Sequence, residues 1–331
     1  MASGVAKMPF REVPLRAKVE LEPWPYGSGK DVTYKLVTIR GKQQNLCHDE
    51  AVLNDLIDTF ETRDNDVFVC TYVKSGTTWT QQIINVLLNK GEKSDKGYAA
   101  AVPWLEALAH ALTNDLSPHG RQATGWTMEA VQANKEQRFF KTHANLKDLP
   151  CGKAPGVKVI YVCRNPKDVC VSLYHHAKNK PMFELDGDFG DVLKFFAEGT
   201  CENGSWFDHV LEWYEASQAD PEHVLFLRYE DMMADPAANI KKIADFSGIE
   251  TTPEIIKKTA EHTSISAMKS GNTVTATKEG AFHFKGHLRK GGAGGWRDVF
   301  TVRQSEELDK VYLKQMAGSG LKMNFGEGLS M

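Results

Sequence analysis

The stretch VFVCTYVKSGTTW, residues 67–79, decides the fold of this chain. Its first half is a short apolar run typical of a buried strand, and the apolar segment 81–88 is compatible with a helix. The polar turn between them lies at the start of that helix, where backbone N–H groups and the helix dipole favour an anion. The order strand, turn and helix therefore predicts a binding site for phosphate or for a group of similar shape and charge.

This turn departs from the common nucleotide-binding loop, which reads G-x-x-x-x-G-K-[ST]. Phe68 stands where the first glycine of that pattern belongs, and Val73 precedes Lys74. The anion would therefore be held by groups from the lysine onward, which are the backbone and side-chain donors of Lys74, Ser75, Gly76, Thr77 and Thr78. A plain strand, turn and helix with incidental hydroxyls is the alternative that this segment alone leaves open.

The composition of the 331 residues is that of an ordinary globular protein, with 41% hydrophobic and 25% charged residues. A net charge of -3 gives no overall basic field for nucleic acid, so an anion site must be local. The six cysteines form no zinc-binding pattern and fit a reducing compartment. Neither a signal-peptide core nor an apolar run of ~20 residues occurs. We therefore predict a cytoplasmic protein without bound metal, membrane or nucleic acid.

Further apolar runs alternate with helix-like segments, which predicts an α/β fold with a mostly parallel central sheet flanked by helices. We expect three more strands, at 138–143, 157–163 and 224–227. We expect helices at 46–60, 126–132, 169–176, 189–198, 206–217 and 236–246, and an apolar loop at 101–105.

Two segments rich in glycine stand apart from this alternation. Residues 1–30 carry clustered prolines, glycines and charges, and we predict an irregular N-terminal arm followed by a single domain over 31–331. Residues 270–295 contain seven glycines and read as a loop that could act as a lid.

Polar residues follow the predicted strands at their carboxyl ends, where ligands bind in parallel sheets. These are Lys74, Lys141 with His143, Arg164 and Tyr229. Lys141 and His143 face the same side of their strand, and a histidine beside a lysine can act as a general base. A structural, hydrogen-bonded histidine is the alternative for His143.

Arg164 stands where a P-loop enzyme places an aspartate for Mg²⁺. A forked guanidinium suits a second phosphate, which Ser172 on the next helix could share. A surface pair between Arg164 and Asp168 is equally compatible with the sequence. His175 and His176 follow on that helix, and we expect them to be structural or, at most, to line the substrate pocket.

Together these segments resemble the cytosolic sulfotransferases, in the same order and over roughly residues 60–320. Residues 72–79 match Y-P-K-S-G-T-T-W, 141–143 match K-T-H, and 164–175 match R-N-P-K-D-V-x-V-S-x-Y-H. Residues 229–232 match Y-E-D-M, and residues 289–296 match R-K-G-x-x-G-x-W. Such motifs are weak singly, but five in order form a specific pattern.

The resemblance implies transfer of a sulfuryl group from 3′-phosphoadenosine 5′-phosphosulfate (PAPS) to a hydroxyl or amine, leaving 3′,5′-ADP and needing no metal. It implies that His143 removes the acceptor proton and that the other members of the catalytic set are Lys74, Lys141 and Ser172. It implies that Ser75 to Thr78 hold the 5′-phosphate and that Lys74 contacts the bridging oxygen and stabilises the leaving phosphate. The adenine would lie beside Trp79, Tyr229 and Thr263. The 3′-phosphate would be bound by Arg164, Ser172, Arg289, Lys290 and Gly291.

The chain departs from the family pattern at a few positions. Val73 replaces a proline, Ile265 replaces a frequent aromatic beside adenine, and Gly295 replaces a common acidic residue. The family's dimer pattern K-x-x-x-T-V-x-x-x-E appears with arginine first, which makes a homodimer plausible through Arg297, Thr301, Val302 and Glu306.

The acceptor is the least determined part of the prediction. The expected pocket residues are apolar or aromatic and favour a hydrophobic alcohol or phenol over a sugar: Trp104, Leu105, Phe140, Tyr174, Phe183 and Phe282, with His143. Two other functions stay open from the residues alone. One is a P-loop kinase-like phosphotransferase, which would need Mg²⁺ and an acidic ligand, and the other is a non-catalytic nucleotide-binding protein.

Overall fold

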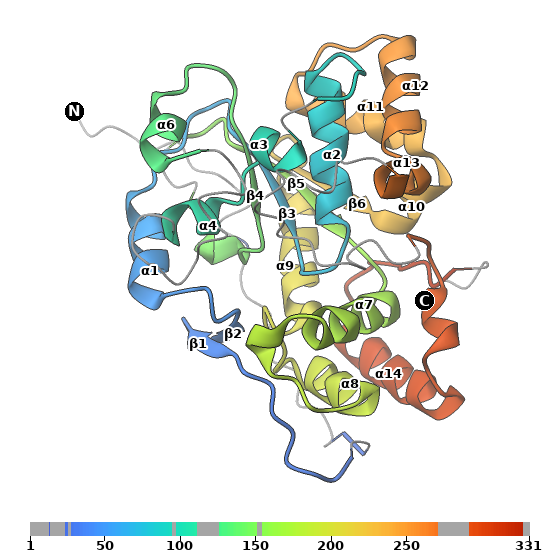
Figure 1. The fold of residues 1–331 in the computed structure, drawn as a ribbon. Helices are drawn as coiled ribbons and strands as arrows, with labels where there is room; N and C mark the ends of the chain where they lie inside the picture. Colours follow the sequence, from blue (N-terminus) through green and yellow to red (C-terminus); the bar gives the residue numbers. More distant parts are fainter. Residues whose placement is uncertain are drawn as a thin grey trace.

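A parallel four-stranded sheet forms the centre of the computed structural model, which describes residues 13, 24–25, 28–94, 97–110, 126–150, 154–270 and 291–326. The strand order is β4-β3-β5-β6, so the chain starts in the middle of the sheet and crosses to both sides (Figure 1). The strands are β3 (Val67–Thr71), β4 (Phe139–Thr142), β5 (Lys158–Cys163) and β6 (Val224–Arg228). The prediction of an α/β fold with a parallel sheet is confirmed.

Both faces of the sheet are buried, because alternate residues of each strand enter two separate hydrophobic clusters. Val67 and Val69 pack with α2 (Thr77–Leu88) and α11 (Pro236–Ser247), while Phe68 and Cys70 face α9 (Trp206–Ala219). Figure 1 shows α2, α11 and α12 together on one side of the strands. Because both faces are buried, the strands are apolar except at their ends, where Lys158, Lys141 and Arg228 occur.

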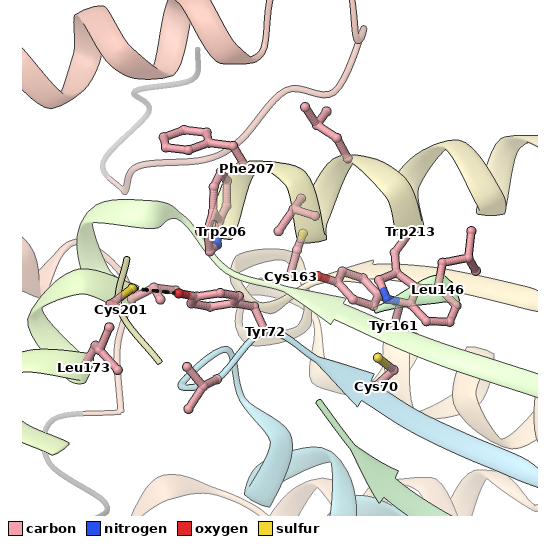
Figure 2. Packing of buried hydrophobic residues seen from close by; sticks show 14 of the residues in the cluster. Cys70, Tyr72, Leu146, Tyr161, Cys163, Leu173, Cys201, Trp206, Phe207 and Trp213 are labelled. Carbon is pink, nitrogen blue, oxygen red and sulfur yellow. Dashed lines mark hydrogen bonds between the residues drawn. The ribbon is translucent and has the colours of Figure 1, made fainter. Parts of the chain in front are cut away.

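Aromatic stacking fills the cluster on the α9 side (Figure 2). The Tyr161 ring stacks on Trp213 with centroids 5.6 Å apart, and Tyr161 Oη lies 2.8 Å from His209 Nδ1. Tyr72 lies beside Cys201 at the carboxyl end of β3. The buried hydroxyls of Tyr161 and Tyr72 thus have polar partners, which a polar group removed from water requires.

The remaining helices cover the sheet and its ends. They are α1 (Glu50–Thr59), α3 (Tyr98–Ala101), α4 (Leu105–His110), α6 (Met128–Ala133), α7 (Pro166–Lys178), α8 (Phe189–Glu198), α10 (Tyr229–Ala234), α12 (Pro253–His262), α13 (Ile265–Ser270) and α14 (Val302–Gln315). Short 3₁₀ turns occur at η2 (Leu146–Asp148), η3 (Pro181–Phe183) and η5 (Gly295–Asp298). No helix in this set, nor any other described helix, has the length and apolar character to cross a membrane.

Some boundaries differ from the sequence predictions for local reasons. The helix expected at 46–60 begins only at Glu50, because the Asp49 side chain accepts a hydrogen bond from Val52 N and caps it. The loop expected at 101–105 is wrong in its limits, since α3 includes Ala101 and α4 starts at Leu105.

Several elements were not among the sequence predictions. The antiparallel pair β1 (Val37–Ile39) and β2 (Lys42–Gln44) is too short to show a period, and α12 and α14 carry largely polar faces. Most of the predicted arm at 1–30 and of the loop at 270–295 lies outside the described residues.

Candidate active site

Two residues of the turn after β3 have a left-handed backbone, which glycine adopts more easily than other residues. Lys74 has φ 69° and Gly76 has φ 107°, both in the left-handed region. A Cβ at Gly76 would lie 2.7 Å from Cδ2 of Tyr229, so the turn passes close to that ring. Ser75 Oγ is buried without a hydrogen-bond partner in the described part of the chain. The turn is therefore tight at the start of α2, and the buried Ser75 hydroxyl remains able to donate a hydrogen bond.

A cavity of about 520 Å³ opens at the carboxyl ends of β3, β4 and β5. It brings together many of the residues predicted from the sequence, namely Val73, Lys74, Gly76, Thr77, Thr78, Trp79, Trp104, Lys141, His143, Arg164, Ser172, Tyr229, Thr263, Ile265, Gly291 and Gly295. These residues come from segments more than 200 positions apart in the sequence. The fold thus converges them on one place, as a shared site requires.

Other predicted residues lie elsewhere. Phe140 is buried against Phe60 and Phe68, because it points to the opposite side of β4 from Lys141. Tyr174 packs on Phe189, and the remaining two, Leu105 and Phe183, are fully buried in the core. Phe282, Arg289 and Lys290 lie outside the described residues.

The imidazole of His143 is fixed by the backbone of the neighbouring strand. Its Nδ1 lies 2.8 Å from the carbonyl oxygen of Thr71, which can only accept, so Nδ1 carries the proton and Nε2 keeps a lone pair. Burial, followed by the charge of Lys141, holds the pKa of His143 well below its ordinary value. The ring is therefore neutral at physiological pH and able to accept a proton at Nε2.

Glu106 holds the strand end that carries His143. Its carboxylate accepts hydrogen bonds from Thr142 Oγ1 and from the backbone N–H of His143, the latter at 3.3 Å. Glu106 lies on α4 and outside the sequence motifs, so this positioning contact was not predicted. The one available signal was that Glu106 is an acidic residue in an otherwise largely apolar segment.

Two lysines enter the cavity with little solvent around them. Burial lowers the pKa of Lys74 and of Lys141 to about 7 in each case. Lys141 Nζ lies 3.6 Å from the centroid of the Trp104 ring, and Lys74 Nζ lies 3.5 Å from His176 Nδ1. An anion placed between these amines would keep both protonated, because opposite charge favours the charged form.

Arg164 forms the other cationic end of the cavity. Its guanidinium donates to the carbonyl of Gly292 at 2.9 Å and lies over the Tyr229 ring at 4.6 Å. It is 3.9 Å from Asp168, but that carboxylate is held by the N–H groups of Gly294 and Trp296. Arg164 Nε is buried without a partner among the described residues, which leaves a donor for an anion.

A second buried carboxylate holds the turn that carries Arg164. Glu230 accepts from both the backbone N and the Nδ2 of Asn165, each at 2.9 Å. Burial raises the pKa of Glu230 to about 7. The Y-E-D-M motif thus contributes Tyr229 to the cavity wall and Glu230 to the support behind it.

The adenine-sized part of the cavity has aromatic and apolar walls. Trp79 and Tyr229 meet edge to face with ring centroids 5.2 Å apart, and Ile265 and Met268 from α13 line the same space. Thr263 is anchored by its hydroxyl, which donates to the carbonyl of Thr259 at 2.8 Å. A flat ring can stack here, between a cationic end at Arg164 and the Lys74 turn.

Within the described ranges, no group of three or more His, Cys, Asp or Glu side chains is arranged to hold a metal ion. The cavity instead gathers cationic side chains, two imidazoles with lowered pKa values, those of His143 and His176, and the carboxylates of Asp168 and Glu202. It can bind a doubly anionic ligand at two points, and it can accept a proton beside the Lys74 end.

Comparisons with known proteins agree with this geometry. The family model described as a sulfotransferase domain matches residues 64–320. Sulfotransferase 1B1 of the dog Canis lupus familiaris is 35% identical over 274 residues, which cover 80% of this chain and 88% of that protein. Sulfotransferase 1 family member D1 of Mus musculus is 34% identical over 275 residues, with 80% and 88% covered.

Solved structures of similar fold also match. The mouse sulfotransferase SULT7A1, solved with PAP, has a TM-score of 0.67 and 29% identity, covering 86% of this chain and 95% of that one. Retinol dehydratase, solved with retinol and PAP, has a TM-score of 0.69 and 26% identity, covering 83% and 88%.

Proposed function

The chain belongs to the sulfotransferase family, and on this premise we propose how the residues of its cavity act. The enzyme transfers a sulfuryl group from PAPS to a small-molecule acceptor. The observation that carries the assignment of roles is one buried cavity that holds Lys74, Lys141 and Arg164 together with the neutral His143. A kinase-like phosphotransferase is not favoured, because the family is that of sulfotransferases and a cation, Arg164, follows β5.

The residues of the cavity fit a nucleotide held by both of its phosphate ends. At the 5′ end, the turn at Lys74–Thr78 offers backbone N–H groups at the start of α2, and Gly76 lets it pass close to the Tyr229 ring. Ser75 Oγ and Arg164 Nε, which have no hydrogen-bond partner among the described residues, support two anionic contacts. We assign the 5′-phosphate to 74–78, and the 3′-phosphate to Arg164, Ser172, Arg289, Lys290 and Gly291, with adenine beside Trp79, Tyr229 and Thr263.

The protein's own contribution to the reaction is positioning and electrostatics. PAPS supplies the activated sulfuryl group. His143 Nε2 removes the proton of the acceptor hydroxyl, while the Thr71 carbonyl keeps the imidazole in the tautomer that can do so. Lys141 stabilises charge on the group being transferred, and Lys74, with Ser172 nearby, stabilises the departing phosphate. This displacement in line requires no metal.

The acceptor is proposed to be a small molecule with an accessible hydroxyl, or an amine, and a hydrophobic body. Trp104 is the predicted acceptor residue that lines the cavity, and Tyr98 and Ala107 extend its apolar wall. Retinol dehydratase, a structural relative, was solved with retinol bound. That relative supports an alcohol on an apolar frame over a sugar.

A transfer assay tests this function directly. The protein is incubated with radiolabelled PAPS and a panel of phenols, steroids, other alcohols and amines, in EDTA and in Mg²⁺, and 3′,5′-ADP binding is measured by calorimetry. We expect transfer to at least one acceptor in EDTA and tight binding of 3′,5′-ADP. Absence of both transfer and binding would overturn the proposed function.

We further propose that the protein is cytoplasmic, that it forms a homodimer, and that a single domain spans residues 31–331 after an N-terminal arm. Free thiols at Cys47, Cys70, Cys163, Cys170 and Cys201 support a reducing compartment. The dimer pattern offers exposed Thr301 and Glu306 and the 76% exposed Val302, whereas Arg297 donates to Gly326 O in its own chain. Light scattering of Val302→Glu tests this, and an unchanged mass would refute the interface.

A further inference from the structure

Four of the polar side chains that line the same cavity outside the sequence motifs come together around one buried carboxylate. They are Asn45, His176, Lys180 and Glu202, from the segment after β2, from α7, from the turn that follows α7 and from the loop after α8. We call them the Glu202 cluster. Glu202 also lines a second hollow of about 50 Å³ together with His143 and Trp104. The cluster therefore lies at the acceptor end of the cavity, beside the catalytic base.

Glu202 is a buried carboxylate with one oxygen left for a ligand. It is 5% exposed, and its Oε1 accepts from Asn45 Nδ2 at 3.1 Å. Its Oε2 pairs with His176 Nε2 at 3.3 Å, a longer contact than an ordinary hydrogen bond, and no other residue in the described part of the chain bonds it. A carboxylate oxygen can accept two hydrogen bonds, so Oε2 can take a donor from a ligand in addition to this long contact.

The charge of Glu202 is maintained despite its burial. Burial by itself raises the pKa of this carboxyl, but His176, Lys180 and Asn45 outweigh it and hold the pKa below its ordinary value. Lys74 and Lys141 also lie near Glu202, and its negative charge raises the pKa of both amines against the effect of burial. Glu202 is therefore an ionised acceptor of hydrogen bonds throughout the physiological pH range.

The loop that carries Glu202 is hydrogen-bonded to Tyr72, just before the turn at Lys74–Thr78. The Tyr72 hydroxyl lies 2.8 Å from the carbonyl of Gly204, 3.1 Å from that of Glu202 and 3.1 Å from Cys201 Sγ (Figure 2). On the other side, Asn203 N donates to the carbonyl of Gln43 at 2.8 Å. Because Tyr72 directly precedes the Val73–Lys74 turn, the carboxylate is held in a set position relative to Lys74, which is how a binding site is preorganised.

We propose that the Glu202 cluster binds a second hydroxyl group of the acceptor, so that the preferred substrates are diols or polyphenols with an apolar frame. The inference rests on the proposed sulfotransferase function and narrows its acceptor class. A neutral hydroxyl donates to Glu202 Oε2 and can accept from Lys180. An acceptor with an ammonium group at this point would instead meet the charges of Lys180 and Lys74, which disfavours it.

Matched acceptors that differ by one hydroxyl test the proposal. Steady-state kcat/KM is measured for 2-naphthol and for the series of dihydroxynaphthalenes, whose second hydroxyl samples different directions from a constant frame. For the wild type we expect at least one dihydroxynaphthalene to exceed 2-naphthol by about 10- to 100-fold, the range for one hydrogen bond to a charged group. Equal values across the whole series would overturn the inference, even though transfer to 2-naphthol would uphold the proposed function.

Substitution of the carboxylate then assigns the preference to Glu202. Glu202→Leu removes the acceptor and Glu202→Gln keeps a neutral one, so the preference for the second hydroxyl should vanish in the first and shrink in the second. Lys180→Met, which leaves Glu202 in place, should reduce the preference less. Preference retained in full by folded Glu202→Leu would refute the role of Glu202.

Glu212→Gln is the matched control for these variants. Glu212 is also a buried carboxylate that accepts from an asparagine, Asn145, but it does not line the cavity. Its substitution should lower thermal stability without changing the ratio of kcat/KM between the two acceptor classes. Calorimetry with 3′,5′-ADP confirms that each variant keeps a folded nucleotide site, and loss of the ratio in Glu212→Gln as well would count against the proposal.

Discussion

The two ends of the cavity are built in different ways. The nucleotide end uses short contiguous segments at the ends of β3 and β5, where backbone N–H groups and Arg164 lie next to one another in the chain or in the sheet. The acceptor end is assembled from side chains on separate loops and helices, such as Asn45, Trp104 and Glu202. The first end offers binding and the second offers chemistry and selectivity, so variants should separate the two.

Substitution of the base should produce the largest separation. His143→Ala removes Nε2 from the acceptor end and should lower kcat about 10²- to 10⁴-fold, the usual contribution of a general base. The affinity for 3′,5′-ADP should stay within about twofold, because the imidazole of His143 bonds Thr71 and, within the described ranges, makes no hydrogen bond with Arg164 or residues 74–78. Single-turnover kinetics and calorimetry measure the two quantities.

His223→Ala is the control for this variant, since that imidazole pairs with Asp220 at the far end of β6. It should leave both quantities unchanged. A His143→Ala enzyme that keeps its turnover, or that loses nucleotide affinity in parallel, would show that the two ends are not separate.

Arg164 should give the reverse result at the nucleotide end. Arg164→Ala removes the guanidinium that lies over Tyr229 and donates to Gly292, and the affinity for 3′,5′-ADP should fall about 10- to 100-fold. At saturating nucleotide the rate of transfer should recover to near the wild-type value, because the acceptor end is intact. If affinity were unchanged, the assignment of the 3′-phosphate to Arg164 would be wrong.

The contrast between the two ends also explains what the sequence could predict. The strand, turn and helix at 67–88, the K-T-H strand end and Arg164 were predicted because each is a local pattern whose place in a parallel sheet follows from topology. The acceptor pocket was predicted from aromatic composition, and only Trp104 of the described candidates other than His143 lines the cavity. Phe140 failed to reach it because neighbouring residues of β4 point to opposite faces.

Of the Glu202 cluster, the sequence analysis named only His176, and it missed the other three residues for a related reason. Asn45, His176 and Glu202 share no spacing, and their meeting depends on how the β2 segment and the loop after α8 pack beneath the catalytic turn. Tertiary contacts of this kind leave no periodic trace in one sequence. Only the structure brings an acidic residue from a Gly- and Asn-containing loop to the base.

A glycine variant sharpens the comparison within the nucleotide end. Gly76→Ala places a Cβ at 2.7 Å from the Tyr229 ring, in a left-handed backbone that costs about 1–2 kcal/mol for other residues. The affinity for 3′,5′-ADP should fall about tenfold as the turn shifts. Gly248→Ala, also left-handed at φ 72° but with nothing within 4 Å, supplies the backbone cost alone. Equal nucleotide affinity in the two variants would mean that the approach of Gly76 to Tyr229 has no role in binding.

The smallest expected effect is a pH dependence that belongs to the nucleotide end. The pKa of Lys74 is lowered to about 7 chiefly by burial, and an anionic phosphate would raise it, so binding takes up a proton wherever the free lysine is neutral. Below pH 7 the lysine is already charged and affinity is level; from pH 7 to pH 8 the dissociation constant of 3′,5′-ADP should rise about fivefold. Ionisation of the phosphate itself, with a pKa near 6, cannot cause this rise because it acts in the opposite sense. Calorimetry at pH 8 in two buffers of different ionisation heat measures the uptake of protons. Affinity that is level from pH 7 to 8, with no uptake, would mean that Lys74 remains charged in the empty site and that the cavity holds its amine by other means than the incoming anion.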